Sequence, residues 1–273
     1  MSLGGLIATG QAVVAASQYS SGFSLDEFPP DGLLGMGFIS ISETGRAPVF
    51  QNLILQGQTT EPVFGFTLLD NGGELVLGGT DTNAFSGSLT IAPLLVTNPP
   101  AFWEISVTSV NVGNRHAVTA AHDAILDTGT TLLIVDPQSA LQIYEQIPGA
   151  EDASSVLGPG FFVVPCDDVP NNVGFTIAGT TFTLSADTFN FGELEEGSNA
   201  CVGGVVGDNE GETVLFKPSL HLSNPIIVDF WILGDVFMRN LYTRPYLPLP
   251  LSDADYKSRL IPQNLISPTY RLA

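Results

Sequence analysis

Residues 124–135 read Ala-Ile-Leu-Asp-Thr-Gly-Thr-Thr-Leu-Leu-Ile-Val, which places one acidic residue, Asp127, between two apolar, strand-like segments. A carboxylate in such surroundings is costly to bury unless it is hydrogen-bonded, paired or neutralised. The Thr-Gly-Thr-Thr run directly after it supplies backbone N–H groups and hydroxyls for a tight loop around that carboxylate. The alternative is an Asp that merely closes a β-turn, and the apolar flanks on both sides argue against it. Asp127 is therefore the residue whose role the fold has to explain.

The rest of the chain predicts an all-β fold. Short strand-like runs alternate with glycine- and asparagine-containing turns, which supply positive φ at little cost. The runs begin at Glu74, Ser88, Glu104, Gly174 and Thr181. Two short helices are predicted over 48–56 and 137–146, because each stretch starts at a proline and carries apolar residues at helical spacing.

Charge and hydropathy exclude several classes of partner. The 273 residues carry 8 Lys and Arg against 28 Asp and Glu, a net charge of −20, which repels phosphate backbones and anionic membrane surfaces. We therefore expect no nucleic-acid partner. No uninterrupted apolar run is long enough for a membrane span, so we expect no membrane insertion. Residues 1–17 are apolar but lack a basic start, and they predict a strand and turn rather than a signal peptide.

The cysteines and histidines give no metal-ligand pattern. Cys166 and Cys201 lack the spacing of a zinc site, and they predict one disulfide, with two free buried thiols as the alternative. A disulfide would imply an oxidising compartment. His116, His122 and His221 are scattered along the chain without ligand spacing. We expect no metal and no cofactor.

The chain contains one internal echo. Asp31-Gly-Leu-Leu-Gly-Met-Gly and Trp231-Ile-Leu-Gly-Asp-Val-Phe both carry two aliphatic residues followed by glycine. Two related lobes would explain the match, with a glycine where one backbone passes close to another. The first-lobe counterpart of Asp127 would then fall before the first residue of this chain.

The order of these pieces resembles the pepsin-like aspartic proteases, peptidase family A1, of the fungal secreted or vacuolar type. The resemblance rests on the Asp127 motif, the echo segments, the cysteine pair and four shorter stretches. These stretches are Thr44–Asn52, Leu77-Gly-Gly-Thr-Asp, Ser86-Gly-Ser-Leu-Thr and Phe102-Trp-Glu-Ile. The match covers residues 20–243.

The resemblance implies a bilobal acid-protease fold whose amino-terminal lobe is incomplete. Residues 1–95 would be the remnant of that lobe and the inter-lobe sheet, and 96–243 the carboxy-terminal lobe. Residues 244–273 would be an atypical Pro-rich tail, in which Pro245, Pro248 and Pro250 exclude a helix interior or a central strand. The missing parts are the first catalytic Asp motif and the flap tyrosine, for which Tyr19 is no substitute. We expect an incomplete gene model.

The same resemblance assigns the site residues and the chemistry. Asp127 would be the catalytic Asp of the second lobe, one of two carboxylates that activate a water between them. Thr128 would tie the active-site loops together and Thr130 would orient the carboxylate. The residues implied to contact substrate are Gly129, Thr131, Ile125, Phe102 and Ile232.

The implied function is an aspartic endopeptidase that cleaves polypeptides in acid, secreted or vacuolar, with activity of this chain in doubt because the partner Asp is absent. The alternative is a non-catalytic pepsin-like module that binds a peptide or a protein. We expect a monomer. A dimer that pairs two Asp127 loops is disfavoured because the first-lobe residues would clash in a simple two-fold arrangement.

Overall fold

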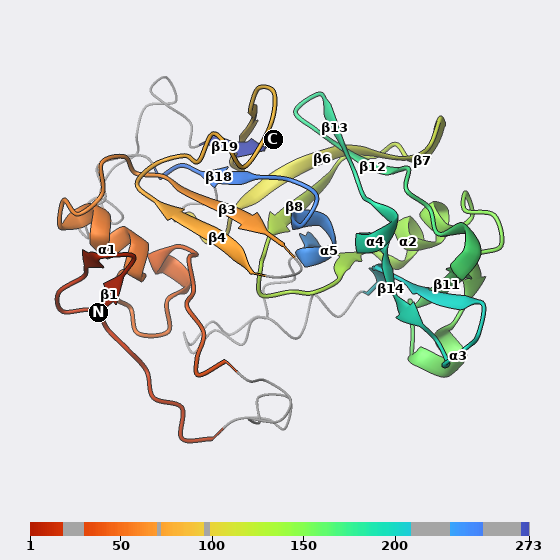
Figure 1. Ribbon diagram of the computed structural model, residues 1–273, viewed down its shortest axis with the longest axis horizontal. Coiled ribbons are helices and arrows are strands. Elements are labelled where there is room, and N and C mark those ends of the chain that lie inside the picture. The colour runs from red at the N-terminus through yellow and green to blue at the C-terminus, as the bar shows by residue number, and fades with distance from the viewer. Residues whose placement is uncertain (19–29, 70–71, 96–98, 209–229, 248–268, 273) are drawn as a thin grey trace.

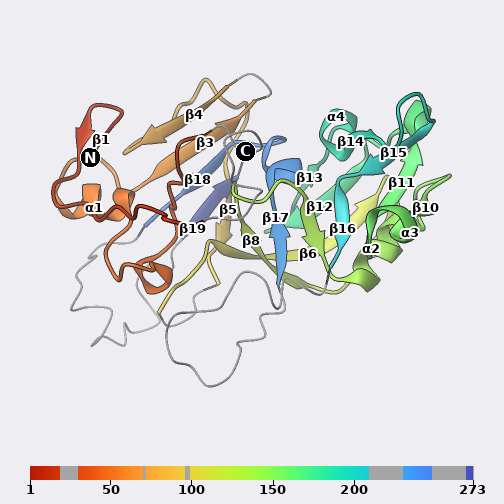
Figure 2. The ribbon, with the colours of Figure 1, turned by 90° about the horizontal axis from the view of Figure 1, so that it is seen from below.

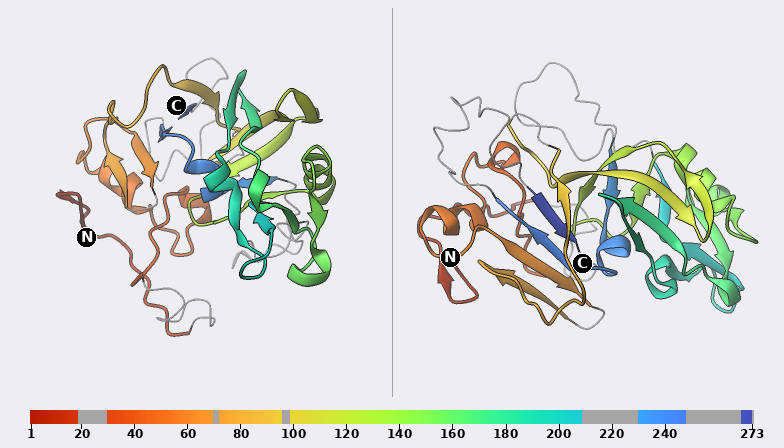
Figure 3. Two further views of the ribbon diagram at one scale, coloured as in Figure 1. Left: turned by 45° about the vertical axis from the view of Figure 1, so that its right-hand side comes forward. Right: turned by 90° about the horizontal axis from the view of Figure 1, so that it is seen from above.

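The computed structural model describes residues 1–18, 30–69, 72–95, 99–208, 230–247 and 269–272. Its elements form two parts that lie side by side in every view (Figures 1 and 3). One part contains the elements of residues 1–95 together with the strands at 243–245 and 269–272, and the other contains the elements of residues 104–207 and 231–238. The expected all-β class is confirmed, since sheets dominate both parts and the described helices are short.

The larger part is organised by an eight-stranded sheet in the order β13-β12-β6-β8-β17-β9-β16, with β7 paired to β6. Its strands are β6 (Glu104–Val112), β7 (Arg115–Val118), β8 (His122–Leu126), β9 (Leu133–Val135), β12 (Val173–Ile177), β13 (Thr180–Thr183), β16 (Val205–Gly207) and β17 (Trp231–Leu233). β8 and β17, both labelled in Figure 2, run parallel, while β9 runs antiparallel to β17. These three strands carry the segment from which the sequence argument started.

Smaller elements cover this sheet. Helix α2 (Pro137–Tyr144) matches the expected helix, and Asp136 caps it by accepting the Ser139 N–H at 2.9 Å. A four-stranded sheet, in the order β10-β11-β15-β14, lies beside the eight-stranded sheet (Figure 2). Its elements and their neighbours are β10 (Glu151–Asp152), α3 (Ser154–Leu157), β11 (Phe162–Pro165), η3 (Cys166–Asp168), α4 (Ala186–Phe189), β14 (Asn190–Glu193) and β15 (Ala200–Gly203).

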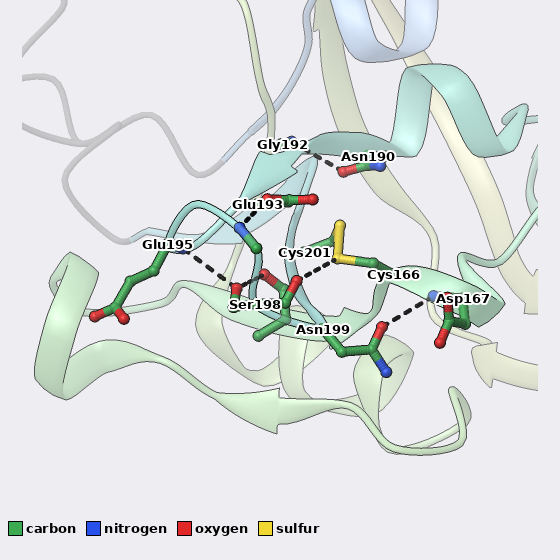
Figure 4. The surroundings of a disulfide bond; sticks show 11 residues. Cys166, Asp167, Asn190, Gly192, Glu193, Glu195, Ser198, Asn199 and Cys201 are labelled. Atoms are coloured by element: carbon green, nitrogen blue, oxygen red, sulfur yellow. Dashed lines mark hydrogen bonds between the residues drawn. A yellow bond between two sulfur atoms is a disulfide. The ribbon is translucent and has the colours of Figure 1, made fainter.

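The predicted disulfide is present in this smaller sheet. Cys166 and Cys201 are bonded, with 5.0 Å between their Cα atoms (Figure 4). Next to the bridge, the Asp167 N–H donates to the Asn199 side chain at 3.2 Å. The loop between the two cysteines carries Glu193, Glu195 and Glu196, all exposed to solvent.

The first part contains a small hairpin, β1 (Ser2–Leu3) with β2 (Leu6–Ile7), which fits the strand and turn expected there. A short 3-10 helix, η2 (Ile39–Ile41), and helix α1 (Val49–Leu55) follow, the latter within the expected range. A five-stranded sheet completes it in the order β4-β3-β18-β19-β5. Its strands are β3 (Phe64–Leu68), β4 (Gly73–Leu77), β5 (Thr90–Pro93), β18 (Thr243–Pro245) and β19 (Thr269–Leu272).

The expectation that Pro245 keeps its segment out of a central strand is wrong. β18 lies between β3 and β19, and Pro245 pairs with Tyr270 of β19. The proline is tolerated because it ends the strand, so only one backbone donor is missing from the ladder. Arg244 is 8 % exposed and its guanidinium contacts Glu61 at 2.7 Å, so this start of the expected tail belongs to the folded sheet. Residues 248–268 lie outside the described part, so the proposed domain boundaries stay a prediction.

Trp103 joins the two parts. Its indole N–H donates to the Met36 carbonyl at 2.9 Å. Its ring packs against Phe38 and Phe64, with centroids 4.7 and 5.5 Å away. Trp103 is therefore a core aromatic residue, and it is 7 % exposed.

The two echo segments have different structures. Ile232 and Leu233 form β17 between β8 and β9 and are 2 % and 0 % exposed. Leu33 and Leu34, their counterparts, are not in a strand and are 74 % and 42 % exposed. Within the described residues, the first copy of the motif thus lacks the flanking strands that bury the second.

Gly234 provides a sharp test of this arrangement. A Cβ at this position would lie 2.2 Å from the Thr130 carbonyl oxygen and 2.3 Å from that of Leu132. Both atoms are backbone and cannot rotate away, so we expect Gly234→Ala to lower the free energy of unfolding by about 2 kcal/mol or more.

Gly35 is the matched control, because it holds the equivalent place in the echo and a Cβ there meets nothing within 4 Å. We expect Gly35→Ala to change the free energy of unfolding by less than about 0.5 kcal/mol. Urea unfolding of both variants measures the difference, and equal effects would contradict the packing described for β17.

Candidate active site

Three strands position the site. β8 ends at Leu126, directly before Asp127, and its parallel neighbour β17 ends at Leu233, directly before Gly234 and Asp235. The strands are in register, Leu233 opposite Leu126, so the two aspartates emerge at the same end of the sheet. β9 begins at the same end and carries the chain away from the Asp127 loop.

The Asp127 carboxylate accepts hydrogen bonds on both oxygens. The Gly129 N–H donates to Oδ1 at 2.9 Å, and the Thr130 hydroxyl donates to Oδ2 at 2.7 Å. An ionised carboxylate is an acceptor at both oxygens, so this pattern suits the charged form. The side chain is half-buried and keeps contact with solvent.

Backbone hydrogen bonds hold the loop against the end of β17. The Asp127 N–H donates to the Leu233 carbonyl at 3.2 Å. In the opposite direction, the Asp235 N–H donates to the Thr130 carbonyl at 2.8 Å and the Val236 N–H to that of Thr131 at 3.0 Å. The loop and the start of α5 (Asp235–Met238) therefore form one backbone unit.

Asp235 is the functional candidate that sequence reasoning missed, although it stands inside the echo motif. Burial, with a further effect from the Asp127 charge, raises the pKa of Asp235 from 3.8 to about 6. One of its carboxyl oxygens is buried without a hydrogen-bond partner among the described residues. The sequence signal for this role is that Asp235 directly follows the apolar Ile-Leu-Gly segment. A residue at the end of such a strand lies next to the residue that ends the neighbouring parallel strand.

The predicted site residues differ in how far their side chains are exposed to solvent. Thr128, Gly129 and Thr131 are exposed on the loop, where a ligand could reach them. Thr130 contacts the carboxylate through its hydroxyl, as described above. The expected roles stay predictions: loop pairing for Thr128, orientation of the carboxylate for Thr130, and substrate binding for Gly129 and Thr131.

Three further predicted residues surround the loop. Phe102 is half-buried, and its ring lies 5.7 Å from that of Phe230, centroid to centroid. It precedes Trp103, whose carbonyl accepts the Leu126 N–H at 3.1 Å, so Phe102 lies close to the start of the loop. Ile125 and Ile232 are opposite one another in β8 and β17 and are 4 % and 2 % exposed. Their assignment as walls of a substrate pocket also stays a prediction.

The described residues hold no group of three or more His, Cys, Asp or Glu side chains arranged to bind a metal ion. His116 contacts Asn111 at 2.6 Å on the surface of the large sheet, and His122 lies at the base of β8. His221 and Tyr19 are outside the described residues. Among the helices of the described part, none combines the length and apolarity needed to cross a bilayer.

Comparison with known proteins places this site in a family. A family model described as eukaryotic aspartyl protease matches residues 1–245. The chain is 33% identical to an aspartic protease of Phaffia rhodozyma over 242 residues, covering 88% of this chain and 54% of the relative. It is 35% identical to rhizopuspepsin-1 of Rhizopus niveus over 249 residues, covering 89% of this chain and 56% of the relative.

An animal enzyme gives a similar match. The chain is 34% identical to cathepsin D of Chionodraco hamatus over 221 residues, covering 78% of this chain and 50% of the relative. The chain spans about half the length of the curated relatives it matches. With the Asp127 loop and the sheet that supports it, these matches show that the chain belongs to the pepsin-like family of eukaryotic aspartyl proteases, which are hydrolases.

Proposed function

We propose that this chain supplies one half of the active site of an acid-acting aspartic endopeptidase, with Asp127 as one of its two catalytic carboxylates. The observation that carries the proposal is the pair of hydrogen bonds that fixes both Asp127 oxygens, at 2.9 and 2.7 Å. They orient an ionised carboxylate at the open end of β8, where it can accept a proton from a bound water.

The reaction needs a second carboxyl group that is protonated when Asp127 is ionised. Two carboxyl groups close together cannot both ionise easily, so one acts as base and the other as acid on a single water. The water attacks the scissile peptide carbonyl as Asp127 takes its proton, and the acid donates a hydrogen bond to the carbonyl oxygen. No bond between enzyme and substrate forms.

Asp235 does not fit the role of that acid. One of its oxygens is buried and its backbone N–H is tied to the Thr130 carbonyl, which places it behind the loop rather than facing substrate. Residues 1–273 contain a single Asp-Thr-Gly sequence. We therefore propose that the second carboxylate comes from polypeptide beyond these residues.

The alternative, a binding module that has lost catalysis, has less support. A protein under no selection for catalysis has no need to keep the aspartate itself, and Asp127 is present with both of its oxygens hydrogen-bonded. We propose a polypeptide as substrate and a secreted or vacuolar location, which the Cys166–Cys201 disulfide supports because such bonds persist in oxidising compartments. We propose a monomer.

A peptidase assay tests the role of Asp127. We expect the 273-residue chain alone to be nearly inactive on a denatured protein at about pH 3 to 5, because one carboxylate cannot be both acid and base. Joined to a first lobe that carries an Asp-Thr/Ser-Gly motif from a pepsin-like protease, it should cleave that substrate. Asp127→Asn in the joined protein should then lower kcat at least about 1,000-fold.

Asp123→Asn is the matched control, because Asp123 is an exposed aspartate on the same strand, and it should leave kcat within about twofold. Inhibition by a statine-type inhibitor identifies the activity as aspartic. Turnover that survives Asp127→Asn would refute the assignment.

The raised pKa of Asp235 predicts a pH-dependent stability. A carboxyl group whose pKa is higher in the folded than in the unfolded protein favours folding through its protonated form. Its contribution is complete below 3.8 and is lost as the pH rises through about 6. Asp235→Asn removes this titration. The variant should therefore gain about 1 kcal/mol relative to wild type between pH 4 and 7, a figure reduced for the solvent that reaches this half-buried group.

Urea unfolding of the wild type and of Asp235→Asn at several pH values measures this difference. A difference between Asp235→Asn and wild type that does not change with pH would contradict the predicted titration.

A further inference from the structure

A second group of side chains lies at the opposite end of the strands that carry the site. His122 is the first residue of β8, Trp231 is the first residue of β17, and Asp136 directly follows β9. Because β9 runs antiparallel to β17, all three residues meet at the base of the strands, away from Asp127. We call these three residues the strand-base cluster.

The members of the cluster contact one another directly. The His122 and Trp231 rings are stacked, 4.2 Å between centroids and 15° between planes. The Trp231 indole N–H donates to Asp136 Oδ2 at 3.1 Å. The same carboxylate oxygen lies 3.8 Å from His122 Nδ1. Each of the three strands thus contributes one side chain to a closed triangle of contacts.

The strength of the contacts within the strand-base cluster depends on the protonation of Asp136 and His122. Burial disfavours the charge on Asp136, but hydrogen bonds from Ser139 and Trp231 and the nearby His122 outweigh it, so the pKa of Asp136 is lowered from 3.8. Asp136 therefore stabilises the fold above 3.8 and loses this effect as the pH falls through its lowered value. A protonated His122 would both attract this carboxylate and stack favourably on the indole, whereas a neutral imidazole would only stack.

Several other groups lie around His122 among the described residues. Its partner in β6 is Val107, which is fully buried and apolar. Asp123 follows it in β8, and its side chain points to the other face of the sheet. On that face, burial and the nearby Asp123 charge raise the pKa of Glu104. Asp208 follows β16 and donates its backbone N–H to the Val135 carbonyl at 2.9 Å. Asp136 contacts the imidazole, with 3.8 Å between its Oδ2 and His122 Nδ1.

We propose that His122 is a positioning residue for the Asp127 loop, and that its charged form locks the register of β8, β17 and β9 in weak acid. The hydrogen bond from the Asp127 N–H to the Leu233 carbonyl forms only if β8 and β17 keep their register. The stacked His122 and Trp231 rings fix the same register at the other end of these short strands. Locking the base therefore restrains the loop at the far end.

The inference concerns the order of the loop, so it holds or fails independently of the proposed peptidase activity. A double-mutant cycle on the full chain tests it, with His122→Phe, which keeps the stacking but not the charge, and Asp136→Asn, which keeps a capping side chain. We expect the two positions to be coupled by about 2 °C in Tm at pH 5 and by less than about 1 °C at pH 8.

Two further variants sharpen the test. His122→Arg keeps a stacking cation at both pH values, so its coupling to Asp136 should persist at pH 8. His116→Phe removes an exposed histidine outside the cluster and should show no coupling at either pH. Coupling that is absent at pH 5, or equal at both pH values for histidine, would overturn the charge dependence.

Hydrogen exchange of the Gly129 amide reports on positioning, because this N–H donates to Asp127 Oδ1. After correction for the intrinsic rate, we expect His122→Phe to speed its exchange severalfold at pH 5 but not at pH 8. His122→Arg should restore protection, and His116→Phe should leave it unchanged. Normal Gly129 protection in His122→Phe at pH 5 would reduce the cluster to a stabilising contact and overturn its positioning role.

Discussion

The structure depends on one constraint, that a carboxylate at the end of a buried strand must have its hydrogen bonds satisfied. Asp127 follows a strand whose last three residues are buried, and the next residues return as another buried strand. Gly129 and Thr130 meet the constraint from within the loop, one with a backbone N–H and the other with a hydroxyl. Because these donors are local, the loop can form before any substrate or second lobe is present.

The same loop explains the position of β17 between β8 and β9. Gly234 allows that strand to approach the Thr130 and Leu132 carbonyls, and the following residues return hydrogen bonds to the loop. Asp235 is thereby brought near Asp127, and its pKa is raised to about 6. When Asp235 is neutral in acid, the Asp127 carboxylate has no second negative charge from Asp235 beside it. This agrees with the proposed activity at low pH.

Much of this arrangement could be predicted from the sequence, because the determining signals are local. Three signals each predict their structure from a few neighbouring residues: the apolar flanks of Asp127, the prolines that begin the helices and the glycines in the turns. The role of Asp235 could not be predicted this way, since it depends on the parallel register of β8 and β17, residues far apart in the chain. Pro245 was misjudged for a related reason: its place as the last residue of β18 depends on pairing with a distant segment. The exposed Leu33 and Leu34, which lie outside any strand, show that this local motif does not form a buried strand by itself.

The most direct test of this account is the chemical shift of the Gly129 amide proton followed by NMR as the pH is varied. A donor to a carboxylate follows the charge of that carboxylate, so the shift should follow the titration of Asp127, with a smaller inflection near pH 6 from Asp235. Asp127→Asn should abolish the main transition, and Asp235→Asn should remove only the smaller one. A Gly129 amide that is insensitive to pH, or whose main transition survives Asp127→Asn, would contradict a preformed carboxylate loop in this chain.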